Sequence, residues 1–376
     1  ARHTAMGATM YHWGLHPWAI YAVVALSLAF FTYNKGMPLT IRSAFYPLLG
    51  ERCWGWPGHI IDILAVLATI FGLATSLGLG AQQAAGGLHF LFDTPNAINV
   101  QVGIIVGVTA VAVLSVVRGL DGGVKLLSNI NMGLAVFLLL FVIVAGPTML
   151  IITGFGTTAV DYISNIIPLS TWFGREDSEW MHGWTVFYWA WWISWSPFVG
   201  MFIARVSRGR TIREFALGVM LVPAGFTLLW MTVFGDSAIR MILDGSYAQL
   251  AEYVKDDNAV ALFRFLEQFP WSGFISGVAT LMVVVFFVTS SDSGSMVVDM
   301  LASGGHDDTP VWQRIFWASS EGLVAIALML AGGLQALQSA TIASALPFSA
   351  VLLIACFGLV RSLKVEGIRR TSFQSN

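Results

Sequence analysis

The stretch FYWAWWISWSPFVGMF, residues 187–202, places four tryptophans within seven positions of an otherwise apolar segment. Tryptophan in a membrane helix usually lies at the two ends, where its ring meets lipid and its N–H meets water. Here Trp191, Trp192 and Trp195 fall near the midpoint of a predicted span over 181–205 and share one helix face, whereas Trp189 points elsewhere. A face of indole rings at mid-membrane depth suits an organic cation that has no proton to donate.

The composition is that of a membrane protein. Of the 376 residues, 56% are hydrophobic and 11% are charged, against roughly 25% charged residues in an ordinary soluble domain. Apolar runs of about 20 residues, each long enough to cross the hydrocarbon core as a helix, recur along the chain. We therefore predict an all-α polytopic membrane protein whose surface meets the lipid bilayer. The net charge of −2 and the lack of a basic tract give no indication of a nucleic-acid partner.

Nine membrane spans are predicted, at approximately 17–33, 58–91, 97–117, 129–153, 181–205, 212–235, 271–302, 312–333 and 340–363. Residues 157–173 mix polar and apolar positions and suit an interfacial helix. Counting Lys and Arg on alternate sides of the spans gives fourteen against four, with Arg2 unassigned. This bias predicts a cytoplasmic C-terminus and an N-terminal end on the outer face. A nine-span chain in that orientation is expected to be truncated at its N-terminus.

Three segments are predicted to interrupt their helices in mid-span: Gly78 to Gly80, Ser194 to Pro197, and Thr289 to Ser295. Backbone groups freed inside a bilayer must be satisfied by protein, water or a bound solute. Broken helices at mid-depth in both halves of a chain are typical of transporters built from repeats. The stretches LATSLGLG (73–80) and FVTSSDSG (287–294) are candidate counterparts in two such halves.

Several segments carry a family resemblance. The stretch FYWAWWISWSPFVGMFIARVSRGRTIREF (187–215) resembles the signature of the betaine/carnitine/choline transporter (BCCT) family, and HWGLHPWAIYAVV (12–24) and FFVTSSDSG (286–294) match the same family in the same order. PLTIRSAFYPLLG (38–50) and SLKVEGIRR (362–370) are most similar to its high-affinity choline-transporter branch.

The resemblance implies a single transmembrane domain with an inverted-repeat (LeuT-like) transporter core. The remainder of the first repeat is expected at 1–153, and the second repeat with the C-terminal spans at 181–363. A homotrimer in the bacterial cytoplasmic (inner) membrane is also implied. Because the family has twelve spans, the chain is expected to match it from the fourth span onward.

An aromatic box for a trimethylammonium group is the central implication of the resemblance. The positions that match the family's box are Trp13, Trp18, Tyr21 and Trp192, those that flank it are Trp191 and Trp195, and those that continue the solute's path are Phe198 and Phe202. A quaternary ammonium donates no conventional hydrogen bond, so ring faces and shape must recognise it. Each ring contributes roughly 0.5–2 kcal/mol. Helix packing and interface anchoring are the alternative roles for these aromatic residues.

A second implied site concerns the coupling ion. In sodium-driven members of the family, the positions of Phe286, Thr289 and Ser290 bind sodium through carbonyl and hydroxyl oxygens, which suit a hard cation. Another sodium position uses two hydroxyl residues one turn apart. Here that pair is Thr69 and Leu73, and a leucine cannot coordinate a cation. In membrane helices Ser and Thr also bond their own backbone, which is the alternative role of these hydroxyls.

The departure at Leu73 and the resemblance to the choline branch favour coupling to protons. Asp292 is an ionisable residue inside a predicted span and is therefore a candidate for that function. Its alternative role is to cap a broken helix through local backbone N–H groups.

These observations predict a secondary active transporter, a symporter that imports choline or a related trimethylammonium solute such as glycine betaine, and no enzyme activity. The alternatives are a sodium-coupled glycine betaine or carnitine transporter, a sensor or channel that binds the same cation, and a quinone- or haem-binding membrane enzyme. His12 and His16 lie four residues apart without an evident third ligand, so no metal site or cofactor is predicted. Cys53 and Cys356 lie far apart and indicate neither a disulfide nor a metal site.

Overall fold

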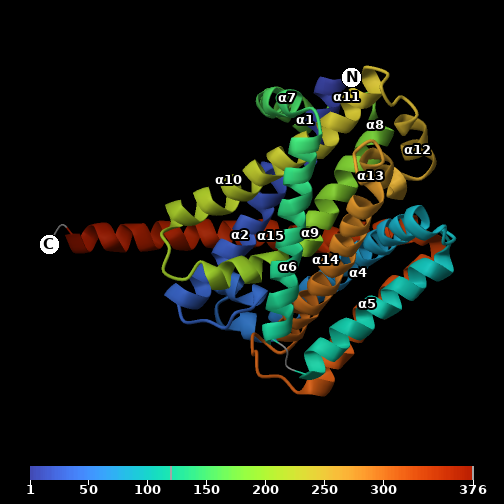
Figure 1. Cartoon of the computed structure of the whole chain (residues 1–376). Helices are drawn as coiled ribbons and strands as arrows, with labels where there is room; N and C mark the ends of the chain where they lie inside the picture. Colours follow the sequence, from blue (N-terminus) through green and yellow to red (C-terminus); the bar gives the residue numbers. More distant parts are fainter. Residues whose placement is uncertain (119–120, 375–376) are drawn as a thin grey trace.

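The computed structural model describes residues 1–118 and 121–374, and every regular element within these residues is a helix. The N-terminal part contains α1 (Arg2–Trp13), α2 (Leu15–Ala29), the π-helical η1 (Phe30–Asn34), η2 (Ile41–Phe45), α3 (Tyr46–Leu49), η3 (Gly50–Trp54) and α4 (Trp56–Phe92). The middle part contains α5 (Ile98–Arg118), α6 (Asp121–Ala145), α7 (Thr148–Ser170), α8 (Ser178–Trp180), the π-helical η4 (Met181–Val186) and α9 (Phe187–Val206). The remainder contains α10 (Ile212–Met231), the π-helical η5 (Thr232–Asp236), α11 (Ser237–Leu243), α12 (Leu250–Asp256), η6 (Asn258–Val260), α13 (Ala261–Leu266), α14 (Ser272–Ala302) and α15 (Val311–Gln374). Figure 1 shows the long helices in one bundle, from which the C-terminal end of α15 projects.

Eight helical stretches in the described residues are long and apolar enough to cross a membrane, namely Arg2–Asn34, Trp56–Phe92, Ile98–Val117, Lys125–Ala145, Thr148–Ser170, Ile212–Leu243, Ser272–Ala302 and Val311–Glu366. The prediction of an all-α polytopic membrane protein is confirmed. α9 coincides with the span predicted at 181–205, but its tryptophan, tyrosine and serine residues lower its hydropathy, and it is not among the eight.

One of the predicted span boundaries is wrong, and another coincides with a break inside a helix. The span predicted at 129–153 ends at Ala145, because Pro147 has no N–H to continue the helix and Thr148 Oγ1 donates to the Ile143 carbonyl at 2.7 Å. The two spans predicted at 312–333 and 340–363 both lie within α15, which leaves the helical conformation at Gly332 and Gly333. Gly333 has φ 62° and ψ −146°, a conformation that glycine adopts without the strain a Cβ would add.

The segment predicted as an interfacial helix at 157–173 forms part of a longer helix, α7. Figure 1 shows α7 nearly end-on while α6 lies close to the plane of the picture, so the chain turns sharply between the two. The location of α7 at a membrane interface stays a prediction.

The three predicted helix interruptions are also wrong, since α4, α9 and α14 are continuous. In α9, Pro197 lacks the N–H that would bond the Ile193 carbonyl, and Ser196 Oγ donates to that oxygen at 2.7 Å instead. In α14, Thr289 Oγ1 and Ser295 Oγ likewise donate to carbonyls of their own helix. Hydroxyl groups that return to the preceding turn compete little with the helix once it is packed on its neighbours.

The glycines of α4 serve close packing and do not break the helix. A Cβ on Gly80 would overlap the Phe287 ring of α14, and a Cβ on Gly78 would overlap Leu337 of α15. In an apolar 18-residue stretch of α4, 72% is buried, whereas the corresponding stretches of Lys125–Ala145 and of Ile212–Leu243 are each 17% buried. α4 is therefore the central helix, and small residues let the neighbouring helices approach it closely.

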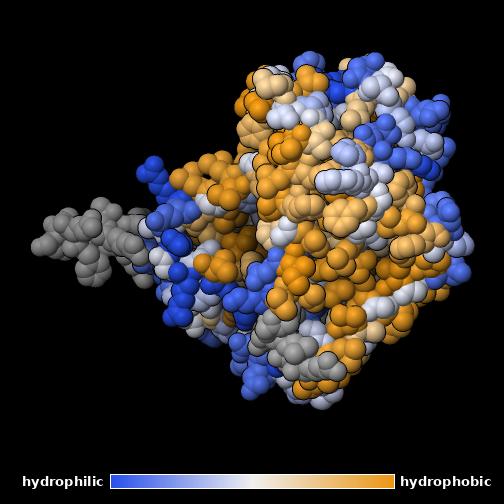
Figure 2. Space-filling model, in the orientation of Figure 1, coloured by the Kyte–Doolittle hydropathy of each residue, from blue (hydrophilic) through white to orange (hydrophobic). Residues whose placement is uncertain are grey.

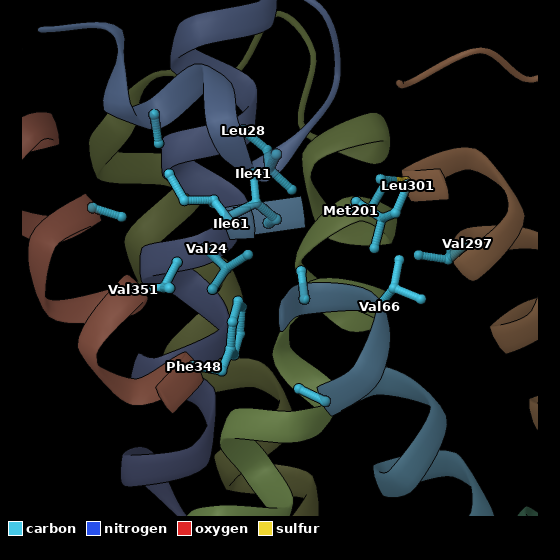
Figure 3. Packing of buried hydrophobic residues seen from close by; sticks show 14 of the residues in the cluster. Val24, Leu28, Ile41, Ile61, Val66, Met201, Val297, Leu301, Phe348 and Val351 are labelled. Carbon is cyan, nitrogen blue, oxygen red and sulfur yellow. The ribbon is translucent and has the colours of Figure 1, made fainter. Parts of the chain in front are cut away.

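The largest cluster of buried apolar residues lies where α2, α4, α9, α14 and α15 meet, and Figure 3 shows its members from close by. It includes Val24, Leu28, Val66, Met201, Leu301 and Phe348. Apolar residues also cover much of the outer face in Figure 2, with hydrophilic residues gathered at its margins. An apolar exterior around a packed interior is what a helical bundle in lipid requires.

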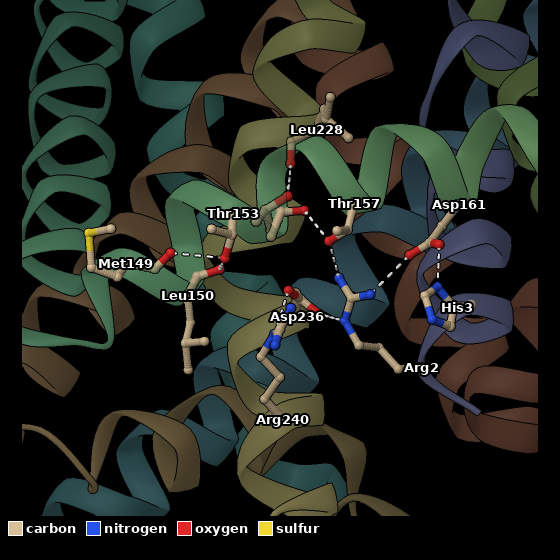
Figure 4. Close-up of polar contacts among 12 residues, drawn as sticks. Arg2, His3, Met149, Leu150, Thr153, Thr157, Asp161, Leu228, Asp236 and Arg240 are labelled. Carbon is tan, nitrogen blue, oxygen red and sulfur yellow. Dashed lines mark hydrogen bonds and ion pairs between the residues drawn. The ribbon is translucent and has the colours of Figure 1, made fainter.

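A buried ionic network lies at the end of the molecule that holds the N-terminus (Figure 4). Arg2 pairs with Asp236 of η5 at 2.5 Å and with Asp161 of α7 at 3.2 Å, and Arg240 pairs with Asp236 at 2.9 Å. The side chains of Asp161 and Asp236 are only 5% and 2% exposed. Because each buried carboxylate has an arginine partner, the network fixes α1 against α7 and α11 without leaving an unpaired charge.

We predict that Gly80→Ala destabilises the protein by about 1–3 kcal/mol, because the new methyl group overpacks the contact between α4 and α14. The measurement is thermal unfolding of purified protein in detergent. Gly103→Ala in α5 is the matched control, since no atom lies within 4 Å of the added Cβ. Equal unfolding temperatures for the two variants would contradict this account of α4 packing.

Candidate functional site

Helices α1, α2 and α9 bring the predicted box residues together. Trp13 is the last residue of α1, Trp18 and Tyr21 lie on α2, and Trp192 lies on α9. Trp192 and Tyr21 are buried at 7% and 4% exposure, and Trp13 and Trp18 pack against the same cluster. The sequence motifs at 12–24 and 187–202 therefore meet in space.

A break between α1 and α2 determines where Trp13 lies. Gly14 leaves the helical conformation, with φ −91° and ψ −128°. The N–H of Leu15 then donates to the Tyr162 hydroxyl of α7 at 2.9 Å instead of continuing the helix. This break sets α1 apart from α2, and both helices contact α9 through their aromatic residues.

The rings pack against one another in near-perpendicular pairs around Trp192. The centroid of Trp192 lies 4.8 Å from that of Trp13 and 6.3 Å from that of Tyr21, and the Trp18 and Tyr21 centroids lie 5.4 Å apart. Trp191 stacks on Trp192 at 5.1 Å. These separations are those of preferred aromatic pairs. A cation binds over a ring face within about 6 Å of its centroid, so the rings must separate before a trimethylammonium group lies between them.

Tyr188 belongs to this cluster and was not among the predicted residues. Its ring lies 5.6 Å from Trp13 and 6.0 Å from Trp192, and His12 stacks on it at 5.0 Å. The signal was present in the sequence, because Tyr188 lies one helical turn before Trp192 and therefore on the same face.

Three of the four α9 tryptophans donate their indole N–H to an acceptor on a neighbouring helix. Trp192 Nε1 donates to the His12 carbonyl of α1 at 2.8 Å. Trp191 and Trp195 both donate to Ser76 Oγ of α4, at 3.1 and 2.9 Å, and Trp195 Nε1 also lies 3.1 Å from the Gly72 carbonyl. These bonds orient the rings and hold α9 between α1 and α4.

The two phenylalanines predicted on the solute's path lie in different environments. Phe198 is partly buried, with its ring centroid 5.4 Å from that of Trp195. Phe202 is 61% exposed on the outer surface of α9. The structure therefore brings Phe198 to the aromatic cluster and leaves Phe202 outside it.

The candidate coupling-ion residues lie on α4 and α14. The hydroxyls of Thr69 and Thr289 donate to carbonyls of their own helices, those of Ala65 and Val285. The side chain of Leu73 lies against Gly294 of α14, where a Cβ would meet it. Phe286 is 48% exposed and Ser290 is partly buried. A leucine thus fills the contact between α4 and α14 one turn after Thr69.

Two buried carboxyl groups lie near each other where α14 meets α15. Asp292 is 4% exposed, and Glu321 of α15 is fully buried. Ser291 Oγ donates to Glu321 Oε2 at 3.3 Å. Glu321 was not predicted, although a single acid in the apolar run ASSEGLVAIALML (318–330) is the kind of signal that marks functional residues in membrane helices.

The fold and this site define a class: a polytopic α-helical membrane protein with a buried aromatic cluster that suits an organic cation. Residues 1–368 match the family model described as BCCT, betaine/carnitine/choline family transporter. The chain belongs to that family. The match runs from the first residue of the chain, so it gives no support to the expectation that the correspondence begins at the family's fourth span.

The relatives of the chain are transporters, which agrees with the prediction of a protein that is not an enzyme. The chain is 56% identical over 369 residues to glycine betaine transporter 1 of Vibrio parahaemolyticus, and the aligned region covers 97% of this chain and 70% of the relative. It is 49% identical over 375 residues to the glycine betaine transporter of Acinetobacter baylyi, covering 100% and 57%, and 42% identical over 377 residues to the high-affinity choline transport protein of Escherichia coli, covering 99% and 56%. The chain thus spans little more than half the length of two of these three relatives.

We predict that Ser76→Ala weakens both the packing of α9 and the binding of a trimethylammonium solute. The Trp191 N–H loses its acceptor and Trp195 keeps only the Gly72 carbonyl, a loss of about 1 kcal/mol of packing free energy for each bond. If about 1 kcal/mol of the total is needed to orient the rings for binding, the affinity falls about fivefold. Choline and glycine betaine titrations followed by intrinsic tryptophan fluorescence measure the effect. Ser349→Ala, whose hydroxyl donates only to the Leu346 carbonyl of its own helix, is the matched control and should bind normally.

Proposed function

We propose that the protein is a secondary active transporter that imports choline or a related trimethylammonium solute such as glycine betaine, by symport with protons. The observation that carries this proposal is the aromatic cluster around Trp192. Membership of the family supports the solute class, and the names of the relatives, which include glycine betaine and choline, support both as substrates to be tested.

Recognition of the solute follows from the chemistry of the rings. The methyl groups of a trimethylammonium spread its charge and donate no conventional hydrogen bond, so a carboxylate attracts the cation but matches its shape poorly. Aromatic ring faces attract the cation and also match its shape. Several rings are needed because each contributes only roughly 0.5–2 kcal/mol. Trp13 on α1, Tyr21 on α2 and Trp192 on α9 come from three helices, so small relative movements of these helices open or close the cluster.

We further propose that alternating access moves the helices of an inverted-repeat core around this cluster, within a homotrimer in the bacterial inner membrane. The fourteen-to-four distribution of Lys and Arg supports a cytoplasmic C-terminus. Coupling to protons is supported by Leu73, which stands where the family resemblance implies a hydroxyl ligand in sodium-driven members, and whose side chain packs against Gly294.

We predict that Trp192→Ala reduces the affinity for choline and glycine betaine by at least about tenfold, since a central ring is lost along with its contacts to Trp13 and Tyr21. Trp192→Phe keeps a ring face and should retain more affinity. The measurement is uptake of radiolabelled solute by proteoliposomes. Trp312→Ala is the control, because Trp312 is 68% exposed and distant in sequence from the cluster motifs. Equal affinities in Trp192→Ala and the wild type would rule out this location of the site.

We predict that an imposed pH gradient, acidic outside, drives solute accumulation in proteoliposomes and that an imposed sodium gradient does not. At one proton per solute, a gradient of about one pH unit sustains about tenfold accumulation. The membrane potential is held at zero so that the charge of choline does not contribute. Accumulation driven only by sodium would favour a sodium-coupled carrier, and binding without accumulation in either gradient would favour a sensor or channel.

A further inference from the structure

Glu321 differs from four other buried carboxyl groups in the described residues. Asp62 pairs with Arg42, Asp161 and Asp236 pair with Arg2, and Asp299 accepts bonds from Thr309 and Gln313. Glu321 has only the Ser291 hydroxyl, 3.3 Å from Oε2, and its Oε1 is buried without a hydrogen-bond partner in the part of the chain that the structure describes. An ionised carboxylate in such surroundings is costly, whereas a protonated carboxyl is tolerated.

Two residues of α14 act on Glu321: Ser291, whose hydroxyl donates to it, and Asp292, whose carboxyl acts on it electrostatically. From α5, Thr109 lies against Gly322, where a Cβ would overlap its side chain, and its hydroxyl is buried without a hydrogen-bond partner. A negative charge on Asp292 adds to the cost of ionising the buried Glu321, so the two groups together favour the binding of a proton.

We propose that Glu321 is a proton-binding group of this protein and that it works together with Asp292. The proposal rests on the proposed function, because a proton site has a role in import only if import is coupled to protons. A permanent ammonium cation neither takes up nor releases a proton, so the solute cannot carry the coupling proton itself. The pair of carboxyl groups supplies a separate place for it.

Contacts join the acid pair to the aromatic cluster. Asp292 and Gly294 lie within one turn of α14, and Gly294 contacts Leu73 of α4. Gly72 and Ser76 accept the indole N–H of Trp195. Leu73 lies between them on α4, one residue after Gly72 and about one turn before Ser76. A shift of α14 on gain or loss of the proton would therefore bear on the helix that positions the rings.

The first test compares two transport modes in Glu321→Gln. Glutamine has the shape of the protonated acid and cannot release a proton, so the variant should fold and bind solute. We expect it to lose accumulation driven by a pH gradient, about tenfold for one pH unit, and to keep exchange of labelled for unlabelled glycine betaine at equal pH. Glu252→Gln, an exposed residue of α12, is the control and should keep both modes. Accumulation by Glu321→Gln within twofold of the control would overturn the proposal.

A second measurement needs no variant. Dicyclohexylcarbodiimide, an apolar carbodiimide, reacts with protonated carboxyl groups inside membranes, and mass spectrometry locates the product. We expect Glu321 of the wild-type protein to be modified, and modification to fall as the pH rises. Absence of modification at any pH would overturn the proposal. If wild-type protein neither binds nor exchanges choline or glycine betaine, the proposed function fails, whereas a pH-dependent modification of Glu321 still identifies a proton-binding group.

Discussion

Hydrogen bonds from the indole N–H groups of three α9 tryptophans to neighbouring helices fix the position of α9. Trp192 finds its acceptor in the carbonyl of His12 at 2.8 Å, and Trp195 finds its own on α4 at Ser76 and Gly72. Lipid offers no substitute for these oxygens, so the bonds persist or are exchanged for equivalent ones. The tryptophan-rich helix is thereby held between α1 and α4 with its rings in a defined orientation, and the remaining helices are arranged around this contact.

Two kinds of interaction surround the rings, and they differ in how easily they move. At the N-terminal end, Arg2 joins Asp161 and Asp236 through directional ion pairs in a buried place, and separating them would leave unpaired charges. Around Trp192 the contacts are ring on ring, with little directional preference between near-perpendicular and stacked pairs. Movement is therefore easier at the aromatic cluster than at the ionic network, which acts as a fixed point for α1.

The long apolar helices and the meeting of the two aromatic motifs were predictable from the sequence, because run length and family motifs determine them. The helix interruptions were not. Pro197 reads as a break, and only the folded chain reveals that Ser196 Oγ bonds the carbonyl that Pro197 leaves without a donor. The glycines of α4 predicted an interruption of the helix, but in the structure they allow Phe287 and Leu337 to pack closely against it. Tyr188 and Glu321 carried recognisable signals, but their significance depends on neighbours that are distant in sequence.

In the transporter that we propose, the solute and the coupling proton have separate sites, and this separation follows from their chemistry. A trimethylammonium group is always charged, so its site must be attractive to a cation in every state and needs no titratable group. A coupling proton has the opposite requirement, because its site must change charge during the cycle. Aromatic faces around Trp192 satisfy the first requirement and cannot satisfy the second. The carboxyl groups of Asp292 and Glu321, buried on other helices, satisfy the second. The proposed function thus assigns the two requirements to side chains on different helices.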